Sequence, residues 1–149
     1  MRLCASHGSA PGAFPGYMRF YESWMGFGEL DVNCWENWLN NTLWEAQQGL
    51  PFTIRWDMGM FGGSDAWLEF GMGAFLMAQA DYCYFGAAAN WYDRDWLPFR
   101  KQYEWQGGEP LGVAVRTAPY RWRRSFEKCA VSVDLVQRSA NFSACGFER

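Results

Sequence analysis

Three short strand-like segments alternate with two helix-like segments in the first part of the chain, and this order limits the fold more than any other feature. The strand-like segments are rich in aromatic and β-branched residues and cover 16–24, 50–56 and 81–86. Consecutive strands that are separated by crossover helices run parallel to one another. We therefore predict an α/β fold with parallel strands, either in an open sheet or in a β/α barrel.

The two helix-like segments differ in how their apolar residues are placed. They cover 33–48 and 64–80. The first opens with a capping box formed by Asn33 and Glu36 and then repeats apolar residues on one face. The second opens at Ser64, a plausible N-cap, and is apolar on most sides, with small residues at Gly71 and Gly73. This pattern predicts a helix that is packed between two layers.

The pattern of the sequence changes after Trp96. Glycine and proline interrupt 97–119 without a helical period, which indicates an irregular connection. Apolar and polar residues alternate in 120–126 and 131–135, which predicts an antiparallel β-hairpin with its arginines on a solvated face, and 140–144 is a candidate third strand. The chain therefore divides into four predicted parts. They are a loop-like leader (1–15), a partial β/α barrel portion (16–96), the connection (97–119) and an antiparallel β tail (120–149).

Composition narrows the kind of partner. Aromatic residues make up 19% of the chain, more than a core of this size requires, so we expect some of them to line a groove or an interface. The formal net charge is −3, which excludes a nucleic acid as the expected partner because phosphates call for a basic surface. The longest apolar stretches fall short of the ~20 residues of a membrane span, so no membrane partner is expected. An uncharged partner fits best.

Cysteine and histidine are placed unfavourably for a metal site. Five cysteines stand far apart without a C-x-x-C pair, and the chain has one histidine. We predict no metal, no cofactor and buried free thiols, since glycine motifs for nucleotides are also missing. Two triplets, beginning at Asn40 and Asn141, match the acceptor pattern for N-glycosylation, which would imply secretion. No signal-peptide pattern follows Met1, so the compartment stays open.

Five segments from Ala80 onward share an order of aromatic, glycine, acidic and alternating residues. They are 80–86, 91–96, 110–114, 120–126 and 131–135. This order resembles the C-terminal end of glycoside-hydrolase-like (β/α)8-barrel proteins, in which a last barrel strand is followed by a Trp/Asp loop, a connection and an antiparallel tail. The resemblance implies that the three parallel strands correspond to the last three strands of such a barrel. Because a whole barrel needs about 250 residues, the chain is similar to a C-terminal piece.

Two acidic residues at predicted strand ends are the candidate catalytic pair. Glu22 and Asp57 end adjacent predicted strands, and neighbouring strands lie ~4.8 Å apart. Glycoside hydrolysis needs two carboxylates ~5–10 Å apart, one to protonate the glycosidic oxygen and one to act as nucleophile or base. In the alternative interpretation, each residue only begins a solvated loop or caps the next helix.

Four tryptophans at or after strand ends are the predicted substrate-binding residues, because indole rings stack on the C–H faces of sugars. They are Trp24, Trp56, Trp91 and Trp96. Core packing accounts for Trp35, Trp38 and Trp67 without a ligand.

Three functions remain open at this stage, and they divide on whether the chain is an enzyme. The first is a carbohydrate-active protein that resembles the C-terminal fragment of a glycoside hydrolase and either acts on oligo- or polysaccharides or is inactive alone. The second is a non-catalytic carbohydrate-binding module, and the third is a protein-interaction module that uses an aromatic face. A partial barrel also leaves sheet edges unpaired, which predicts self-association.

Overall fold

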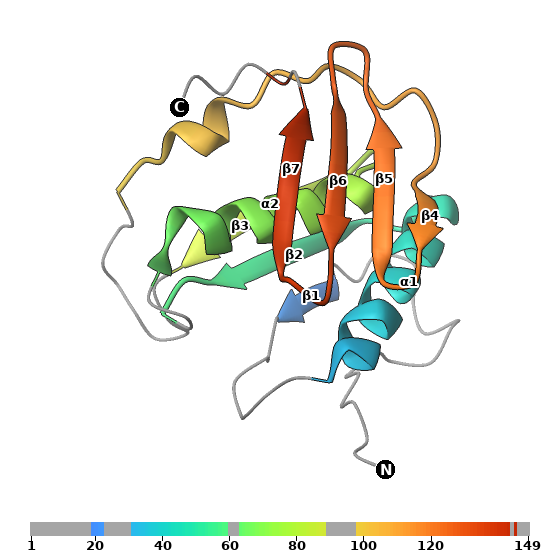
Figure 1. Cartoon of the computed structure of the whole chain (residues 1–149), viewed down its shortest axis with the longest axis horizontal. Coiled ribbons are helices and arrows are strands. Elements are labelled where there is room, and N and C mark those ends of the chain that lie inside the picture. Colours follow the sequence, from blue (N-terminus) through green and yellow to red (C-terminus); the bar gives the residue numbers. More distant parts are fainter. Residues whose placement is uncertain (1–18, 23–30, 60–62, 89–97, 144, 146–149) are drawn as a thin grey trace.

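The structure is a computed structural model, and it describes residues 19–22, 31–59, 63–88, 98–143 and 145. The helices and strands follow one another along the chain as shown in Figure 1. They are β1 (Arg19–Glu22), α1 (Val32–Gln47), β2 (Phe52–Asp57), α2 (Asp65–Ala78), β3 (Cys83–Ala88), the short 3-10 helix η2 (Lys101–Glu104), β4 (Val115–Ala118), β5 (Arg121–Ser125), β6 (Ala130–Asp134) and β7 (Ser139–Ser143). The predicted leader, 1–15, lies outside the described residues.

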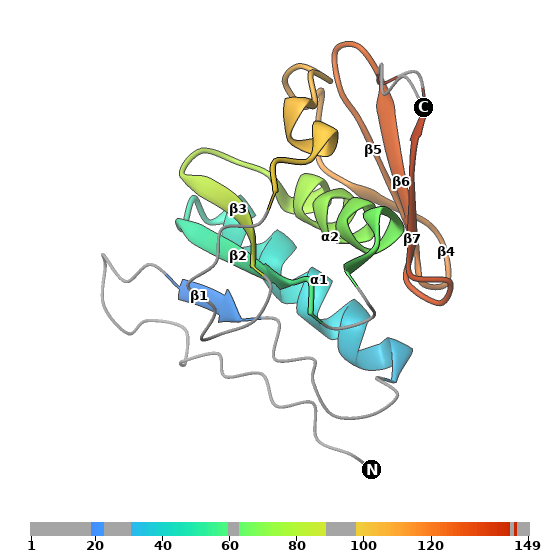
Figure 2. The same ribbon diagram turned by 90° about the vertical axis from the view of Figure 1, so that its left-hand side faces the viewer.

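The first three strands form a parallel sheet in the order β1-β2-β3. The α/β prediction is therefore confirmed, with two helices connecting three parallel strands. Both helices lie on one side of this sheet (Figure 2). Each helix connects a strand to its immediate neighbour, and the strands are added in one direction across the sheet. Because such crossover connections are right-handed, all helices then lie on the same face of the sheet. This portion therefore has the arrangement β-α-β-α-β, with each helix connecting two neighbouring parallel strands.

Helix α1 begins earlier than the sequence pattern suggests. The N-cap is Asp31, whose side chain accepts the backbone N–H of Asn33 at 3.0 Å, so the prediction of Asn33 as N-cap is wrong. Asp31 takes this position because its carboxylate also accepts the side-chain amide of Asn33, at 2.7 Å. The helix ends before Gly49, whose positive φ of 68° suits glycine.

Helix α2 is packed between two sheets, as its apolar surface predicts. Ser64 is the N-cap and accepts the backbone N–H of Trp67 at 3.2 Å, which confirms the predicted start. A Cβ added at Gly71 would meet Trp56 of β2, and one added at Gly73 would meet Ala140 of β7. The two glycines therefore face opposite layers and let both sheets approach the helix backbone.

The C-terminal part is a four-stranded antiparallel sheet in the order β4-β5-β6-β7. The predicted hairpin is present as β5 and β6, and the candidate third strand is β7. The structure also contains β4, a strand that the sequence analysis did not predict. It lies within the segment predicted as an irregular connection, and it pairs with β5. Arg121 and Arg123 are exposed as expected, but Arg124 turns inward and binds the C-terminal end of α2.

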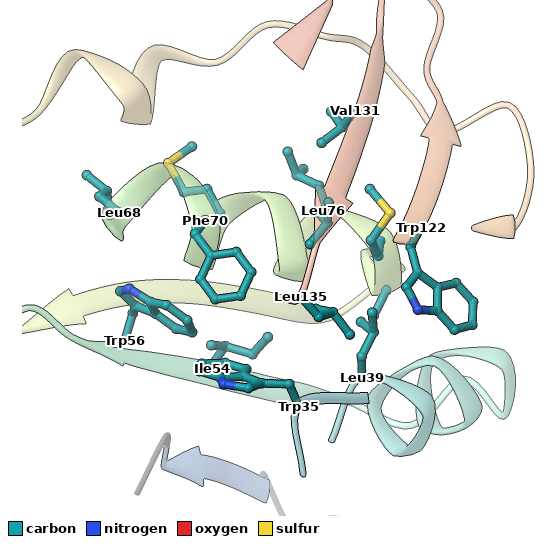
Figure 3. Packing of buried hydrophobic residues seen from close by; sticks show 14 of the residues in the cluster. Trp35, Leu39, Ile54, Trp56, Leu68, Phe70, Leu76, Trp122, Val131 and Leu135 are labelled. Carbon is teal, nitrogen blue, oxygen red and sulfur yellow. The ribbon is translucent and has the colours of Figure 1, made fainter. Parts of the chain in front are cut away.

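One core joins the three layers. Buried aromatic and aliphatic side chains from α1, β2, α2 and the antiparallel sheet form a single cluster (Figure 3). The tryptophans that the structure describes belong to this cluster or pack against it, with the exception of Trp44, which is 45% exposed. Trp35 and Trp67 are core residues and Trp38 packs against the core, so packing accounts for all three, as predicted. Much of the aromatic excess therefore serves packing. In the described part of the chain, no helix combines the length and apolarity that a membrane crossing requires.

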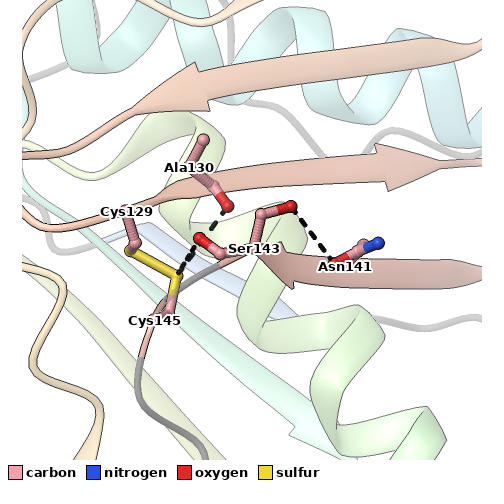
Figure 4. Close-up of a disulfide and its surroundings, with 5 residues drawn as sticks. All are labelled: Cys129, Ala130, Asn141, Ser143 and Cys145. Atoms are coloured by element: carbon pink, nitrogen blue, oxygen red, sulfur yellow. Dashed lines mark hydrogen bonds between the residues drawn. A yellow bond between two sulfur atoms is a disulfide. The ribbon is translucent and has the colours of Figure 1, made fainter.

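The cysteines differ from the sequence prediction. Cys129 and Cys145 form a disulfide that joins the start of β6 to the residues after β7 (Figure 4). Cys34 is also disulfide-bonded, and Cys83 is the free cysteine of the described residues. The prediction of buried free thiols is therefore wrong for these three. Cys129 and Cys145 meet because antiparallel pairing of β6 with β7 brings Ala130 opposite Ser143.

Candidate functional site

The face of the parallel sheet that is turned away from the helices carries the candidate site. Phe52, Ile54 and Trp56 of β2 point to the helices and are buried, so the alternate residues of the strand belong to the opposite face. No element among the described residues covers that face (Figure 2). It is lined by partly or fully exposed side chains and by small residues: Thr53, Asp57, Tyr84, Gly86 and Ala88.

Asp57 is the last residue of β2 and is held in place at two points. Its Oδ1 accepts the backbone N–H of Gly59 at 2.8 Å, and its backbone carbonyl accepts the indole N–H of Trp67 at 2.7 Å. The carboxylate is partly exposed at the C-terminal end of the sheet. Asp57 therefore stabilises the turn that follows β2, as the alternative interpretation proposed, and it also lies where a catalytic carboxylate of a barrel would lie.

Glu22 is described through its backbone, as the last residue of β1. It is paired in parallel register with Arg55, two residues before Asp57. Glu22 and Asp57 therefore end adjacent strands at the same edge of the sheet. Strand geometry places their Cα atoms about 8 Å apart, since they are offset by one strand spacing and two residues. That separation is compatible with the carboxylate pair of a glycoside hydrolase.

Trp56 does not form the predicted sugar platform. The residue is 0% exposed, and its ring centroid lies 5.9 Å from that of Trp35 and 4.5 Å from that of Trp67. Its indole N–H donates to the backbone carbonyl of Trp67 at 3.0 Å. The physical reason is strand parity: Trp56 shares the helix-facing side of β2 with Ile54. The other predicted platforms, Trp24, Trp91 and Trp96, lie outside the described residues.

Tyr84 is an exposed aromatic residue on this face that sequence reasoning did not select. It is 57% exposed and stands opposite Thr53 in the register of β2 and β3, about 13 Å along the strand from the level of Asp57. The alternation of side chains along β3 could have identified it. Cys83 and Phe85 pack against the core, so Tyr84, which lies between them in the sequence, belongs to the other face of the strand. Tyr84 and Asp57 thus mark the two ends of one uncovered strip.

Small residues leave room beside Asp57. Ala88 is its partner in register on β3, and a Cβ added at Gly86 would meet nothing within 4 Å. A carboxylate with open space beside it and an aromatic ring farther along the same face can contact a ligand that has hydroxyl groups and apolar C–H faces.

Two other kinds of reactive site were considered among the described residues, a nucleophilic thiol and a metal-binding cluster. Burial raises the pKa of the Cys83 thiol, so this free cysteine stays protonated at neutral pH. Within residues 19–22, 31–59, 63–88, 98–143 and 145, no group of three or more His, Cys, Asp or Glu side chains could hold a metal ion.

Comparison with known proteins adds no relative to these observations. No protein-family model matches the sequence, and no curated protein matches it significantly.

Proposed function

We propose that this chain is part of a carbohydrate-active protein whose glycan-binding surface is the uncovered face of the parallel sheet. One observation carries the proposal: three parallel strands advance in order with both helices on one side, and two of these strands end in Glu22 and Asp57 at the same edge. Enzymes built on β/α barrels place catalytic residues at this edge. The resemblance of 80–135 to glycoside-hydrolase-like proteins supports the same function.

The two acidic residues have different proposed roles. One of the two would protonate the leaving oxygen, and the other would act as nucleophile or base. The N–H of Gly59 donates to Asp57 Oδ1, which fixes the direction of that carboxylate at the end of β2. Tyr84 would stack on a sugar unit that is bound farther along the sheet.

The proposed activity needs more of the barrel than these three strands. β1 and β3 are the edge strands of the described parallel sheet, and a closed barrel has eight strands and about 250 residues. Further β/α units, supplied by a longer form of the protein or by a second chain, would complete the site. The 149-residue chain by itself is then expected to bind a glycan weakly and to turn it over slowly or not at all.

The test compares matched acidic variants. Binding to a panel of insoluble and soluble polysaccharides and release of reducing ends are measured for the chain, for any longer form, and for Glu22→Gln and Asp57→Asn. The control is Asp81→Asn, which makes the same change at the opposite end of the sheet, just before β3. We expect the two site variants to lose turnover while they keep glycan binding, and the control to keep both. Absence of glycan binding in both forms of the protein would refute the proposal.

A protein-interaction module is the second candidate, and the surface next to β4 favours it. Leu111, Val113 and Val115 are 67%, 63% and 54% exposed, and they lead into an edge strand of the antiparallel sheet. Exposed apolar residues beside an unpaired edge can pair with a partner chain. If Glu22→Gln and Asp57→Asn change nothing and no glycan binds, this function replaces the first.

A further inference from the structure

The C-terminal acceptor triplet lies on an exposed edge strand. Asn141, Phe142 and Ser143 belong to β7, which is one edge of the antiparallel sheet. Ala140 and Phe142 pack against the core, whereas Asn141 and Ser143 are exposed on the other face. Residues two apart on a strand share a face, so the asparagine and the hydroxyl of the triplet lie side by side.

We propose that Asn141 is an N-glycosylation site and that the protein matures in an oxidising, glycosylating compartment. The Ser143 hydroxyl donates a hydrogen bond to Asn141 Oδ1 at 3.4 Å, so the two functional groups of the acceptor pattern already meet in the folded chain (Figure 4). This inference is independent of the carbohydrate-active function proposed above.

The disulfide beside the triplet is the second observation. Cys145 follows Ser143 closely in the chain and is bonded to Cys129, and Cys34 is disulfide-bonded as well. Structural disulfides form and persist in secreted and extracellular proteins and are rare in reducing compartments. N-glycans are added to secreted proteins too. The disulfides and the acceptor triplet therefore point to the same compartment.

The outer face of the antiparallel sheet can accept a glycan at Asn141. In register, Asn141 stands opposite Ser132 of β6, which stands opposite Arg123 of β5. These neighbours are polar and at least partly exposed, so a sugar would cover no apolar contact. A glycan here would also shield the unpaired edge of β7 against pairing with another chain.

The other triplet, at Asn40, lacks this arrangement. Asn40 and Thr42 lie in α1, where residues two apart do not face each other. Thr42 is 0% exposed, and its hydroxyl donates to the backbone carbonyl of Trp38 at 2.9 Å. This triplet would have to leave the helix before its hydroxyl could reach the asparagine amide. We therefore assign the glycan to Asn141.

The transfer uses a lipid-pyrophosphate-linked oligosaccharide as donor. A bond forms between Nδ2 of Asn141 and C1 of the first sugar, and the bond between C1 and the pyrophosphate oxygen breaks. The lipid pyrophosphate leaves with the electron pair, and the amide loses one proton to a base. No oxidant or reductant takes part.

One proteolytic fragment pair reports on both modifications. The full chain is secreted from eukaryotic cells behind a cleavable leader and is digested with trypsin without reduction. Trypsin cleaves after Lys128 and Arg138, so the disulfide joins fragments 129–138 and 139–149, and the second fragment carries Asn141. Treatment with peptide N-glycosidase in heavy-oxygen water marks each glycosylated asparagine as a labelled aspartate.

We expect most of the disulfide-linked pair to carry a labelled aspartate at position 141. Asn141→Gln and Ser143→Ala should abolish this label, whereas Ser143→Thr, Asn40→Gln and the neighbouring control Ser139→Ala should keep it. The linked pair itself shows that each variant has folded. Secreted, disulfide-linked protein with an unmodified Asn141, or with a glycan on Asn40 alone, would overturn the proposal.

Discussion

A Cβ added at Gly71 would overlap the indole ring of Trp56, so helix α2 approaches strand β2 closely at that point because Gly71 has no side chain. Gly→Ala inside a helix normally stabilises a protein by about 0.5–1 kcal/mol. Here a methyl group would overlap the buried ring. We therefore expect Gly71→Ala to destabilise the protein instead, and to lower the free energy of unfolding by about 1–3 kcal/mol in urea titrations. Gly112→Ala, where a Cβ meets nothing within 4 Å, is the control and should change little.

Arg124 should stabilise the C-terminal end of helix α2. Its Nη1 donates to the carbonyls of Leu76 at 2.9 Å and Gln79 at 2.8 Å, and burial lowers the pKa of the guanidinium. Its Nε binds the carbonyl of Gly112 at 2.8 Å. A lysine cannot reproduce this fork, so Arg124→Lys should cost about 1.5–3 kcal/mol in urea titrations. The exposed neighbour Arg123→Lys is the matched control, and equal losses in both variants would contradict the capping role.

The disulfide between Cys129 and Cys145 should hold β7 to the sheet. It closes a loop with a sequence separation of 16 residues, for which loop entropy predicts a contribution of about 3 kcal/mol. We expect the double variant Cys129→Ser, Cys145→Ser to lose stability of that order and to speed amide hydrogen exchange in β7 more than in β2. Cys83→Ser, which removes no bridge, provides the comparison. Unchanged exchange in β7 would argue against this role.

The Cys83 thiol should react slowly in the folded chain. Burial raises the pKa of Cys83 above its ordinary value of 9.0, so the folded state holds the proton more tightly than the unfolded state does. The associated stability is complete below pH 9.0 and is lost as pH rises through the folded-state pKa. At mildly alkaline pH, alkylation of Cys83 by iodoacetamide should therefore be slower in native protein than in urea. Equal rates in both states would show that burial does not control the thiol.

Self-association through the parallel sheet remains a prediction, and β3 is the edge at which to test it. Tyr84 is 57% exposed on this strand, so Tyr84→Lys adds a charge where a second chain would pair. We expect the sedimentation coefficient of the chain to rise with concentration and the variant to reduce this rise. Trp44→Lys, which changes an exposed aromatic residue on α1, should not. A monomer at all concentrations would refute the prediction.

Much of the fold could be predicted because its signals are local. The periods of α1 and α2 and the alternation in β5 and β6 are properties of short segments, and each of these elements formed where its pattern occurs. β4 has no comparable local pattern. It is a strand because Val115 and Arg116 pair with β5, and pairing with a distant segment is not visible in a segment surrounded by glycine and proline.

The placement of the candidate acidic pair could be predicted from the sequence, and its catalytic role stays a prediction. Glu22 and Asp57 were placed at one edge of the sheet by the direction of the strands alone, and the structure agrees with that placement. Trp56 is a core residue because the face of a strand residue depends on where the helices pack. The same parity exposes Tyr84 on the opposite face. Position at a strand end therefore did not suffice to predict which aromatic side chain is exposed.

The sequence by itself determined which segments become helices and parallel or antiparallel strands, because backbone propensity and apolar period act over a few residues. The tertiary structure alone decided three further features. It brought the Cα atoms of Cys129 and Cys145 to 4.9 Å, it placed the guanidinium of Arg124 at the carbonyls that end α2, and among the described residues it left one face of the parallel sheet without a covering element. Each of these features depends on the packing of layers that are distant in the sequence, and no local pattern carries that information.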